Sequence, residues 1–328
     1  MNCPSPLQLW NVPIPPPLRQ TAYREYVTSF CRSQTTHAPQ YMRELDVSNG
    51  VTAITGAYQG GTCVGLSLSK AGQDIDLSFF KELTASRPGV VFLKFPLAPG
   101  ERITEVLVRG MPNQYAPGDP LQVPCIVIWT ARGRFFSFGP YVPPEKRQYY
   151  AFQRLVGQKG FDVDSICFSD QSTPFYGFRT GVTFHPSDYP HLAENSACSQ
   201  YWSSSLPTVM PDPFQRMDLS WQAVDVSRFQ AFRACMQVRD GTEFCIGLEF
   251  GEYVLGQWRD DGEIRFFAVH SRLRLRNGIC PDGNFVKVEE IDSMSPSAED
   301  GDCVPIRGRV EWWCGPNFSL VASSDALY

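Results

Sequence analysis

A row of basic residues is the pattern in this sequence that points most directly to chemistry. In the segment Phe266–Arg276, apolar and basic residues alternate with the two-residue period of a β-strand. One face of this strand carries four basic residues, His270, Arg272, Arg274 and Arg276. Such a row can hold a carboxylate or phenolate, and His270 at its apolar end can move a proton. The sequence therefore predicts His270 and Arg272 as catalytic residues and Arg274 as a ligand-binding residue.

The same face has a second interpretation. Acidic residues on a neighbouring strand, such as Glu289 and Glu290, can pair with a solvent-facing row of cations and leave no binding site.

Tryptophans beside polar turns are the other candidates for ligand binding. Trp258 precedes Arg259, and Trp312 and Trp313 are adjacent near the C-terminus. Aromatic rings at such places can stack on a sugar or wall an apolar pocket. We therefore predict ligand contacts from Trp258, Arg259, Trp312 and Trp313. Neighbours in a strand face opposite sides, so one of the last two must be exposed or covered by another layer.

Signs of a metal or cofactor are weak. Residues His185, Asp188 and His191 form a local group of metal-type ligands, but two prolines separate them and favour a solvated turn. Phosphate-loop, nicotinamide and flavin fingerprints do not occur, and no Gly-x-Ser-x-Gly elbow is found. We expect neither a metal nor a cofactor.

The elements that position these residues are predicted to be mainly strands. Leu18, Ala22, Tyr26 and Phe30 recur every four residues after a run of prolines and predict a short N-terminal helix. From residue 51 onward, short apolar runs punctuated by Gly and Pro predict strands. The clearest are Gln122–Thr130 and, after the turn at residues 131–134, Phe135–Phe138. The fold prediction is all-β, with two lectin-like sandwich or prism units and a short N-terminal helix.

Hairpin signals continue in the second half. Asp240-Gly241 and Asp261-Gly262 are expected to join pairs of strands. The predicted organisation is an N-terminal extension over residues 1–44, a first β unit over 45–185, a long loop over 186–220 and a second β unit over 221–328.

A short internal similarity links the two predicted units. Cys63–Leu68 (CVGLSL) matches Cys245–Phe250 (CIGLEF) in residue type, and two related β units would explain it.

Composition restricts the classes of partner. The 328 residues carry a net charge of -5, which offers no electrostatic footprint for nucleic acid or an anionic membrane. No secretory leader and no apolar run of membrane-spanning length is seen, so we expect a cytoplasmic protein. The 11 cysteines lie mostly in apolar runs, where reduced thiols act as small hydrophobes.

Two resemblances add to these patterns. The segments Cys245–Leu248, Leu255–Arg259 and Arg309–Trp313 resemble a broad, mostly uncharacterised family of filamentous-fungal proteins. The segments Gly100–Gly110, Ile126–Pro140 and Gly157–Phe168 resemble strands of jacalin-type β-prism lectins. The jacalin sugar site depends on a C-terminal loop that has no clear counterpart here.

These observations leave two classes of function open. The first is a small-molecule-binding protein of fungal specialised (secondary) metabolism, acting as a carrier or as a cofactor-independent cyclase, isomerase or cycloaddition catalyst. Such a site needs only shape, aromatic walls and one or two donors. The second is a lectin-like, carbohydrate-binding or protein-interaction module without catalysis. The expected partner is therefore a small molecule or a glycan.

Overall fold

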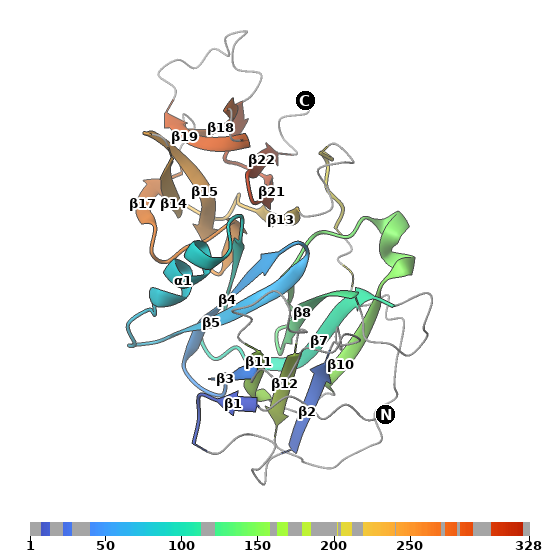
Figure 1. The fold of residues 1–328 in the computed structure, drawn as a ribbon. Helices are drawn as coiled ribbons and strands as arrows, with labels where there is room; N and C mark the ends of the chain where they lie inside the picture. The colour runs from blue at the N-terminus through green and yellow to red at the C-terminus, as the bar shows by residue number, and fades with distance from the viewer. Residues whose placement is uncertain are drawn as a thin grey trace. The chain divides into compact units, whose positions relative to one another are not determined.

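The computed structural model describes residues 8–13, 22–27, 40–112, 122–157, 163–169, 179–184, 202, 205–211, 219–239, 241–269, 273–280, 283–290 and 303–323 (Figure 1). The protein is all-β, as predicted, and is built from several mostly antiparallel sheets. Within the described residues there are one α-helix, α1 (Ser78–Ser86), and one short 3-10 helix, η2 (Pro144–Tyr149).

The chain forms two compact units, and the second interrupts the first in sequence. Unit 1 comprises residues Met1–Asp74 and Leu97–Trp202, and unit 2 comprises Ile75–Pro96 and Ser203–Tyr328. The segment 75–96, which carries α1 and the strand β6 (Val91–Pro96), thus belongs with the C-terminal half of the chain.

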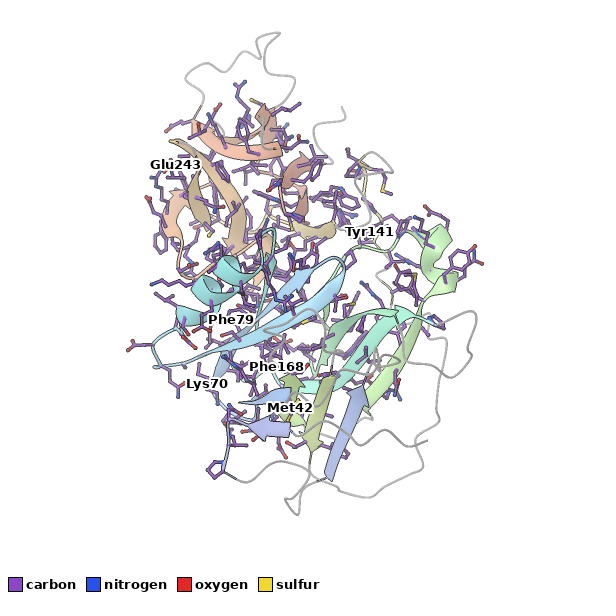
Figure 2. All side chains as sticks on the ribbon, in the orientation of Figure 1. Met42, Lys70, Phe79, Tyr141, Phe168 and Glu243 are labelled. Carbon is purple, nitrogen blue, oxygen red and sulfur yellow. The ribbon has the colours of Figure 1, made fainter. Side chains whose placement is uncertain are left out.

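Unit 1 contains two larger sheets and a hairpin. One sheet has the order β1-β3-β11-β12-β2, with the bounds β1 (Gln8–Trp10), β2 (Ala22–Val27), β3 (Gln40–Asp46), β11 (Val163–Ser169) and β12 (Arg179–Phe184). A second has the order β10-β7-β8-β9, with the bounds β7 (Ile103–Met111), β8 (Gln122–Thr130), β9 (Phe135–Ser137) and β10 (Ala151–Gly157). The hairpin joins β4 (Val51–Gln59) to β5 (Thr62–Lys70). Met42 and Phe168 are buried in this unit (Figure 2).

Unit 2 contains two further sheets, together with α1 and β6. The smaller has the order β13-β21-β22, with the bounds β13 (Ser220–Asp225), β21 (Arg309–Gly315) and β22 (Phe318–Ser323). The larger has the order β17-β14-β15-β19-β18-β20, and β16 also pairs with β15. Its strands are β14 (Ala231–Arg239), β15 (Thr242–Phe250), β16 (Tyr253–Gly256), β17 (Glu263–Ala268), β18 (Leu273–Cys280), β19 (Gly283–Glu290) and β20 (Cys303–Pro305).

A β-bulge lies in the first copy of the repeated sequence. In the β4–β5 hairpin, Gly65 pairs with Ala57 and Cys63 pairs with Tyr58, which leaves Val64 as the extra residue of β5. The Cys63 thiol donates a hydrogen bond to the Gly65 carbonyl at 3.6 Å.

The second copy contains the same bulge. In the β14–β15 hairpin, Gly247 pairs with Cys235 and Cys245 pairs with Met236, so Ile246 is the extra residue of β15. The Cys245 thiol donates to the Gly247 carbonyl at 3.3 Å. The similarity of the two sequences therefore corresponds to the same local backbone in both units.

Several sequence predictions are confirmed residue by residue. The strand predicted over Gln122–Thr130 has those bounds, and Pro and Gly residues flank its apolar run in the sequence. The turn at residues 131–134 leads into β9, and Gly241 lies between β14 and β15, which pair as predicted. Gly241 has a φ of 75°, the left-handed conformation that such a turn requires.

The predicted N-terminal helix is wrong. Residues Ala22–Val27 form the strand β2, which pairs antiparallel with β12. The four-residue spacing that predicted a helix is also a multiple of the two-residue strand period, so it did not distinguish the two structures.

The single long strand predicted over Phe266–Arg276 is also wrong. The region forms two strands with different partners, since β17 pairs with β14 while β18 pairs with β19 and β20. The turn at Asp261-Gly262 is present, but β16 pairs with β15 rather than with β17. The pairing partner of each strand depends on the order of strands in the whole sheet, and the local sequence does not specify that order.

Candidate functional site

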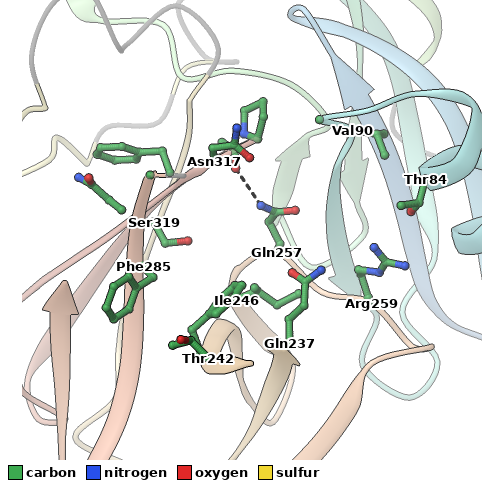
Figure 3. Close-up of a pocket in the computed structure, with 17 residues that line it drawn as sticks. Thr84, Val90, Gln237, Thr242, Ile246, Gln257, Arg259, Phe285, Asn317 and Ser319 are labelled. Atoms are coloured by element: carbon green, nitrogen blue, oxygen red, sulfur yellow. Dashed lines mark hydrogen bonds between the residues drawn. The ribbon is translucent and has the colours of Figure 1, made fainter. Parts of the chain in front are cut away.

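The described residues of unit 2 enclose a pocket of about 310 Å³ (Figure 3). Its walls come from the segment between α1 and β6, from β14 and β15, from the residues after β16, from the start of β19 and from the turn between β21 and β22. The size is at the lower end of ligand pockets in proteins, which run from roughly 300 to 1,000 Å³.

Apolar side chains contribute part of the lining. Phe244 and Ile246 come from β15, Phe285 from β19 and Phe318 from β22. Ile246 is the extra residue of the β15 bulge and is 5% exposed. The bulge therefore determines where this part of the lining lies.

Gln257 is fixed against the bulge by its backbone and its side chain. Its amide donates to the Ile246 carbonyl at 2.7 Å, and its side-chain Nε2 donates to the Gly315 carbonyl at 2.9 Å. The approach is so close that a Cβ on Gly247 would lie 1.9 Å from the Gln257 carbonyl oxygen. Glycine at position 247 thus permits the geometry of this wall.

Other polar side chains of the lining remain available for a ligand. Gln237, Thr242 and Asn284 line the pocket, and none of their side chains has a hydrogen-bond partner in the described part of the chain. Figure 3 shows Gln237 and Gln257 between Arg259 on one side and Phe285 on the other. Carboxamides both donate and accept hydrogen bonds, which suits ligand groups that do the same.

The charge in this lining is balanced. Arg259 is the one ionisable residue among the described lining residues, and Asp261 binds its guanidinium through two bonds, of 2.9 Å from Nε and 2.8 Å from Nη2. Its guanidinium also lies 5.3 Å from the centre of the Phe92 ring. A bidentate pair of this kind holds the cation in place, so the pocket presents a nearly neutral surface.

The residues on either side of Arg259 belong to a buried charged cluster. Asp260 accepts hydrogen bonds from Lys94 Nζ at 2.6 Å and from Trp258 Nε1 at 2.9 Å. Lys94 and Arg233 lie 5.5 Å and 5.6 Å from the centre of the Trp258 ring. Trp258 and Asp260 thus belong to this cluster, whereas Arg259 between them lines the pocket.

Glu249 completes the cluster and pairs with Arg233. Burial raises the pKa of Glu249, and the nearby cations Arg233 and Lys94 oppose this rise. Glu249 is 6% exposed and does not line the pocket, so this group lies in the interior of unit 2.

The three tryptophans predicted to bind a ligand are all buried. Trp258 is 1% exposed, and Trp312 and Trp313 are each 0% exposed. For the adjacent pair, both faces of β21 are therefore covered by other layers. Trp313 Nε1 donates to the Val209 carbonyl at 2.9 Å. A role for these rings in ligand binding stays a prediction.

Of the predicted basic residues, Arg259 lies in the pocket and Arg274 lies on β18, away from it. Leu273 and Leu275 are buried while Arg274 and Arg276 are partly exposed, so the predicted alternation holds within β18.

Acidic residues on the neighbouring strand support the second interpretation of this basic row. Arg276 Nε donates to Glu289 on β19 at 2.6 Å.

Two predicted groups lie outside the described residues. These are the catalytic candidates His270 and Arg272 and the group of ligands at residues 185–191. Among the residues that the structure does describe, no three His, Cys, Asp or Glu side chains gather as a metal site would require.

No family model matches the chain, and no curated protein matches it. Two lectins of solved structure align with about half of it. The prostate-specific glycoprotein lectin WGA16 is 16% identical, with a TM-score of 0.29 over 46% of this chain and 95% of its own. Frutapin, a lectin from Artocarpus incisa, is 14% identical, with a TM-score of 0.29 over 51% of this chain and 99% of its own. The fold class is therefore assigned from the strands and sheets of this protein and not from these alignments.

No helix in the described part of the chain is long and apolar enough to span a membrane.

Sequence reasoning missed most of the pocket. Arg259 was predicted, but Gln237, Gln257 and Asn284 were not. The sequence did contain a signal, namely polar residues beside tight turns. These are the glutamines near strand ends and the Gly-Asn and Pro-Asn pairs at residues 283–284 and 316–317. Nothing in the sequence indicated that these turns meet.

Proposed function

We propose that the protein is a carbohydrate-binding protein and that the pocket of unit 2 binds a neutral sugar without chemical change. The observation that carries this proposal is the character of the lining, which combines free carboxamide and hydroxyl groups with phenyl rings and has its single cation neutralised.

Sugar hydroxyls explain why such a lining is suitable. Each hydroxyl both donates and accepts hydrogen bonds, as do the side chains of Gln237, Thr242 and Asn284. The C–H faces of a sugar ring are apolar and pack on aromatic side chains, for which Phe244 and Phe285 are placed.

A second candidate function comes from the sequence, namely a carrier or cofactor-independent catalyst for an anionic or oxygenated small molecule of fungal specialised metabolism. An anionic ligand requires an available cation, and Arg259 is already held by Asp261. The catalytic candidates His270 and Arg272 lie outside the described residues. The geometry of this pocket thus favours the neutral glycan.

The test is a glycan array followed by calorimetric titration of any glycan that binds. We expect Gln237→Ala to weaken binding about tenfold, the loss that follows from one or two hydrogen bonds in a ligand site. Gln237 makes no side-chain hydrogen bond to described residues, so this substitution leaves the fold intact. Gln257→Ala should weaken binding at least as much.

The matched control is Gln230→Ala, which removes an exposed glutamine of the same unit outside the pocket. It should bind as the native protein does. Absence of any bound glycan, or native affinity in both pocket variants, would overturn the proposal. Saturable binding of small aromatic or terpenoid acids would favour the second candidate.

A further inference from the structure

Arg109 in unit 1 is a buried cation that has no acidic partner among the described residues. It lies on β7, is 6% exposed, and donates one hydrogen bond from Nη2 to the Pro140 carbonyl at 2.6 Å. Its Nε is buried and has no hydrogen-bond partner in the part of the chain that the structure describes. A buried guanidinium with unused donors carries a large desolvation penalty unless an anion or acceptor meets it.

Three other guanidiniums of the described chain are bound by carboxylates, in the pairs Arg134 with Glu101, Arg259 with Asp261 and Arg276 with Glu289. No carboxylate lies within salt-bridge distance of Arg109 among the described residues.

A second cation shares the same aromatic side chain. The guanidiniums of Arg109 and Arg147 lie 5.8 Å and 5.2 Å from the centre of the Trp202 ring. Arg147 is partly exposed, and its Nε donates to the Val142 carbonyl at 3.4 Å. Two like charges on one indole repel each other, and an anion between or beside them relieves that repulsion.

Tyr150 adds a hydroxyl donor to this group. Its ring lies 5.9 Å from the Arg109 guanidinium and packs edge-on against Trp202, with 6.2 Å between the ring centres. Burial raises the pKa of Tyr150 while the Arg109 charge opposes the rise, so the hydroxyl stays protonated at neutral pH.

Packing holds the group at a fixed place on the sheet. Trp202 covers a buried cluster formed by Leu107, Cys125, Val127 and Phe152, and its ring lies 5.0 Å from that of Phe152. Arg109 pairs in register with Phe152 on β10. Arg147 and Tyr150 are partly exposed, whereas Arg109 is buried.

We infer that Arg109, Arg147 and Tyr150 form an oxyanion-binding site over Trp202, which takes the carboxylate, sulfate or phosphate group of a small ligand. Arg109 supplies the guanidinium N–H donors that the Pro140 carbonyl does not take, and Arg147 supplies the outer charge. This site lies in unit 1 and does not depend on sugar binding in unit 2.

The test is titration of the native protein with acetate and with sulfate by calorimetry, against chloride at constant ionic strength. Saturable binding of at least one oxyanion is expected. Acetate binding points to a carboxylate ligand, and preference for sulfate points to a sulfate or phosphate group. Arg147→Gln should weaken the bound oxyanion about tenfold, as expected for loss of a charge-assisted hydrogen bond.

Arg132→Gln is the matched control, because Arg132 is an exposed arginine of a turn in the same unit. It should bind as the native protein does. Arg109→Lys keeps the buried charge but loses the fork, and should also weaken binding. If it fails to fold, the comparison of Arg147→Gln with Arg132→Gln decides the matter. Equal affinity in these two variants, or no saturable binding by the native protein, would overturn the inference.

Discussion

Lys94 Nζ lies 2.6 Å from Asp260 Oδ1, and the two side chains are 8% and 7% exposed. The same carboxylate oxygen accepts a hydrogen bond from Trp258 Nε1. A buried ion pair of this kind stabilises a fold only as long as both partners are present, because either charge alone remains desolvated.

Replacing Lys94 by methionine should therefore destabilise unit 2. We expect Lys94→Met to lower the free energy of unfolding by about 3–5 kcal/mol, since it leaves Asp260 buried without its cation. Urea denaturation measures the change. The control is Lys70→Met, which breaks the pair of Lys70 with Asp46, whose carboxylate is 61% exposed. That change should cost about 0–1 kcal/mol. Equal losses in the two variants would show that burial of the pair is unimportant.

Glu101 should make unit 1 sensitive to acid. Burial by itself would raise the pKa of Glu101, but hydrogen bonds from Arg134, Thr130 and the Ala98 amide outweigh it and hold the pKa below the ordinary value of 4.5. The ionised form is thus favoured in the folded state, and its contribution is complete above pH 4.5 and is lost as the pH falls through the lower folded value.

Thermal unfolding measured from pH 7 down to pH 3 tests this prediction. Glu101→Gln should be less stable than the native protein at pH 7, and the difference should shrink as the pH falls. A constant difference across this range would contradict the assignment.

Gly247, beside the pocket residues Ile246 and Gln257, should not tolerate a side chain. A Cβ there would meet the Gln257 carbonyl at 1.9 Å, so Gly247→Ala must displace backbone. We expect a loss of more than about 3 kcal/mol, in the range of severe single substitutions. Gly241→Ala is the control, because φ is 75° there but the space is open. It should cost about 1–2 kcal/mol from backbone strain alone. Similar losses in the two variants would mean that β16 moves freely.

Cysteine reactivity should follow burial. Burial raises the pKa of Cys63 to about 12, which leaves on the order of one thiol in ten thousand ionised at pH 8. Burial raises the pKa of Cys245 as well, whereas Cys303 is partly exposed. Iodoacetamide labelling followed by peptide mass spectrometry should show Cys303 modified well before the other two. Equal rates in native protein would indicate frequent opening of both hairpins.

The sequence predicted structure best where apolar runs end at strong turns. Gln122–Thr130 and the hairpin around Gly241 were predicted correctly because Pro, Gly and Asp mark their ends. The prediction failed at Ala22–Val27, where a four-residue spacing of apolar residues is compatible with both the helix period and the strand period.

The α-helix at Ser78–Ser86 was missed. It is only nine residues long, and its apolar face is limited to Phe79, Phe80 and Leu83. Its signal was Asp76, whose carboxylate accepts a hydrogen bond from the Ser78 amide at 3.0 Å.

The candidate site was harder to predict than the fold. Arg259 follows from its place beside Trp258, but its neutralisation depends on a turn that brings Asp261 to the same guanidinium. The remaining lining residues come from strands that are distant in sequence, and only the pairing order of the sheet places them together. That order is a long-range property which local patterns do not contain.

The interruption of unit 1 by residues 75–96 has a consequence for the order of events on the ribosome. Lys94 and Asp260 are 166 residues apart, so Lys94 leaves the exit tunnel long before its partner is made. At typical rates of synthesis this delay is roughly 8–33 s. During that interval Lys94 has no Asp260 to pair with, so this ion pair of unit 2 forms only after most of the chain has been made.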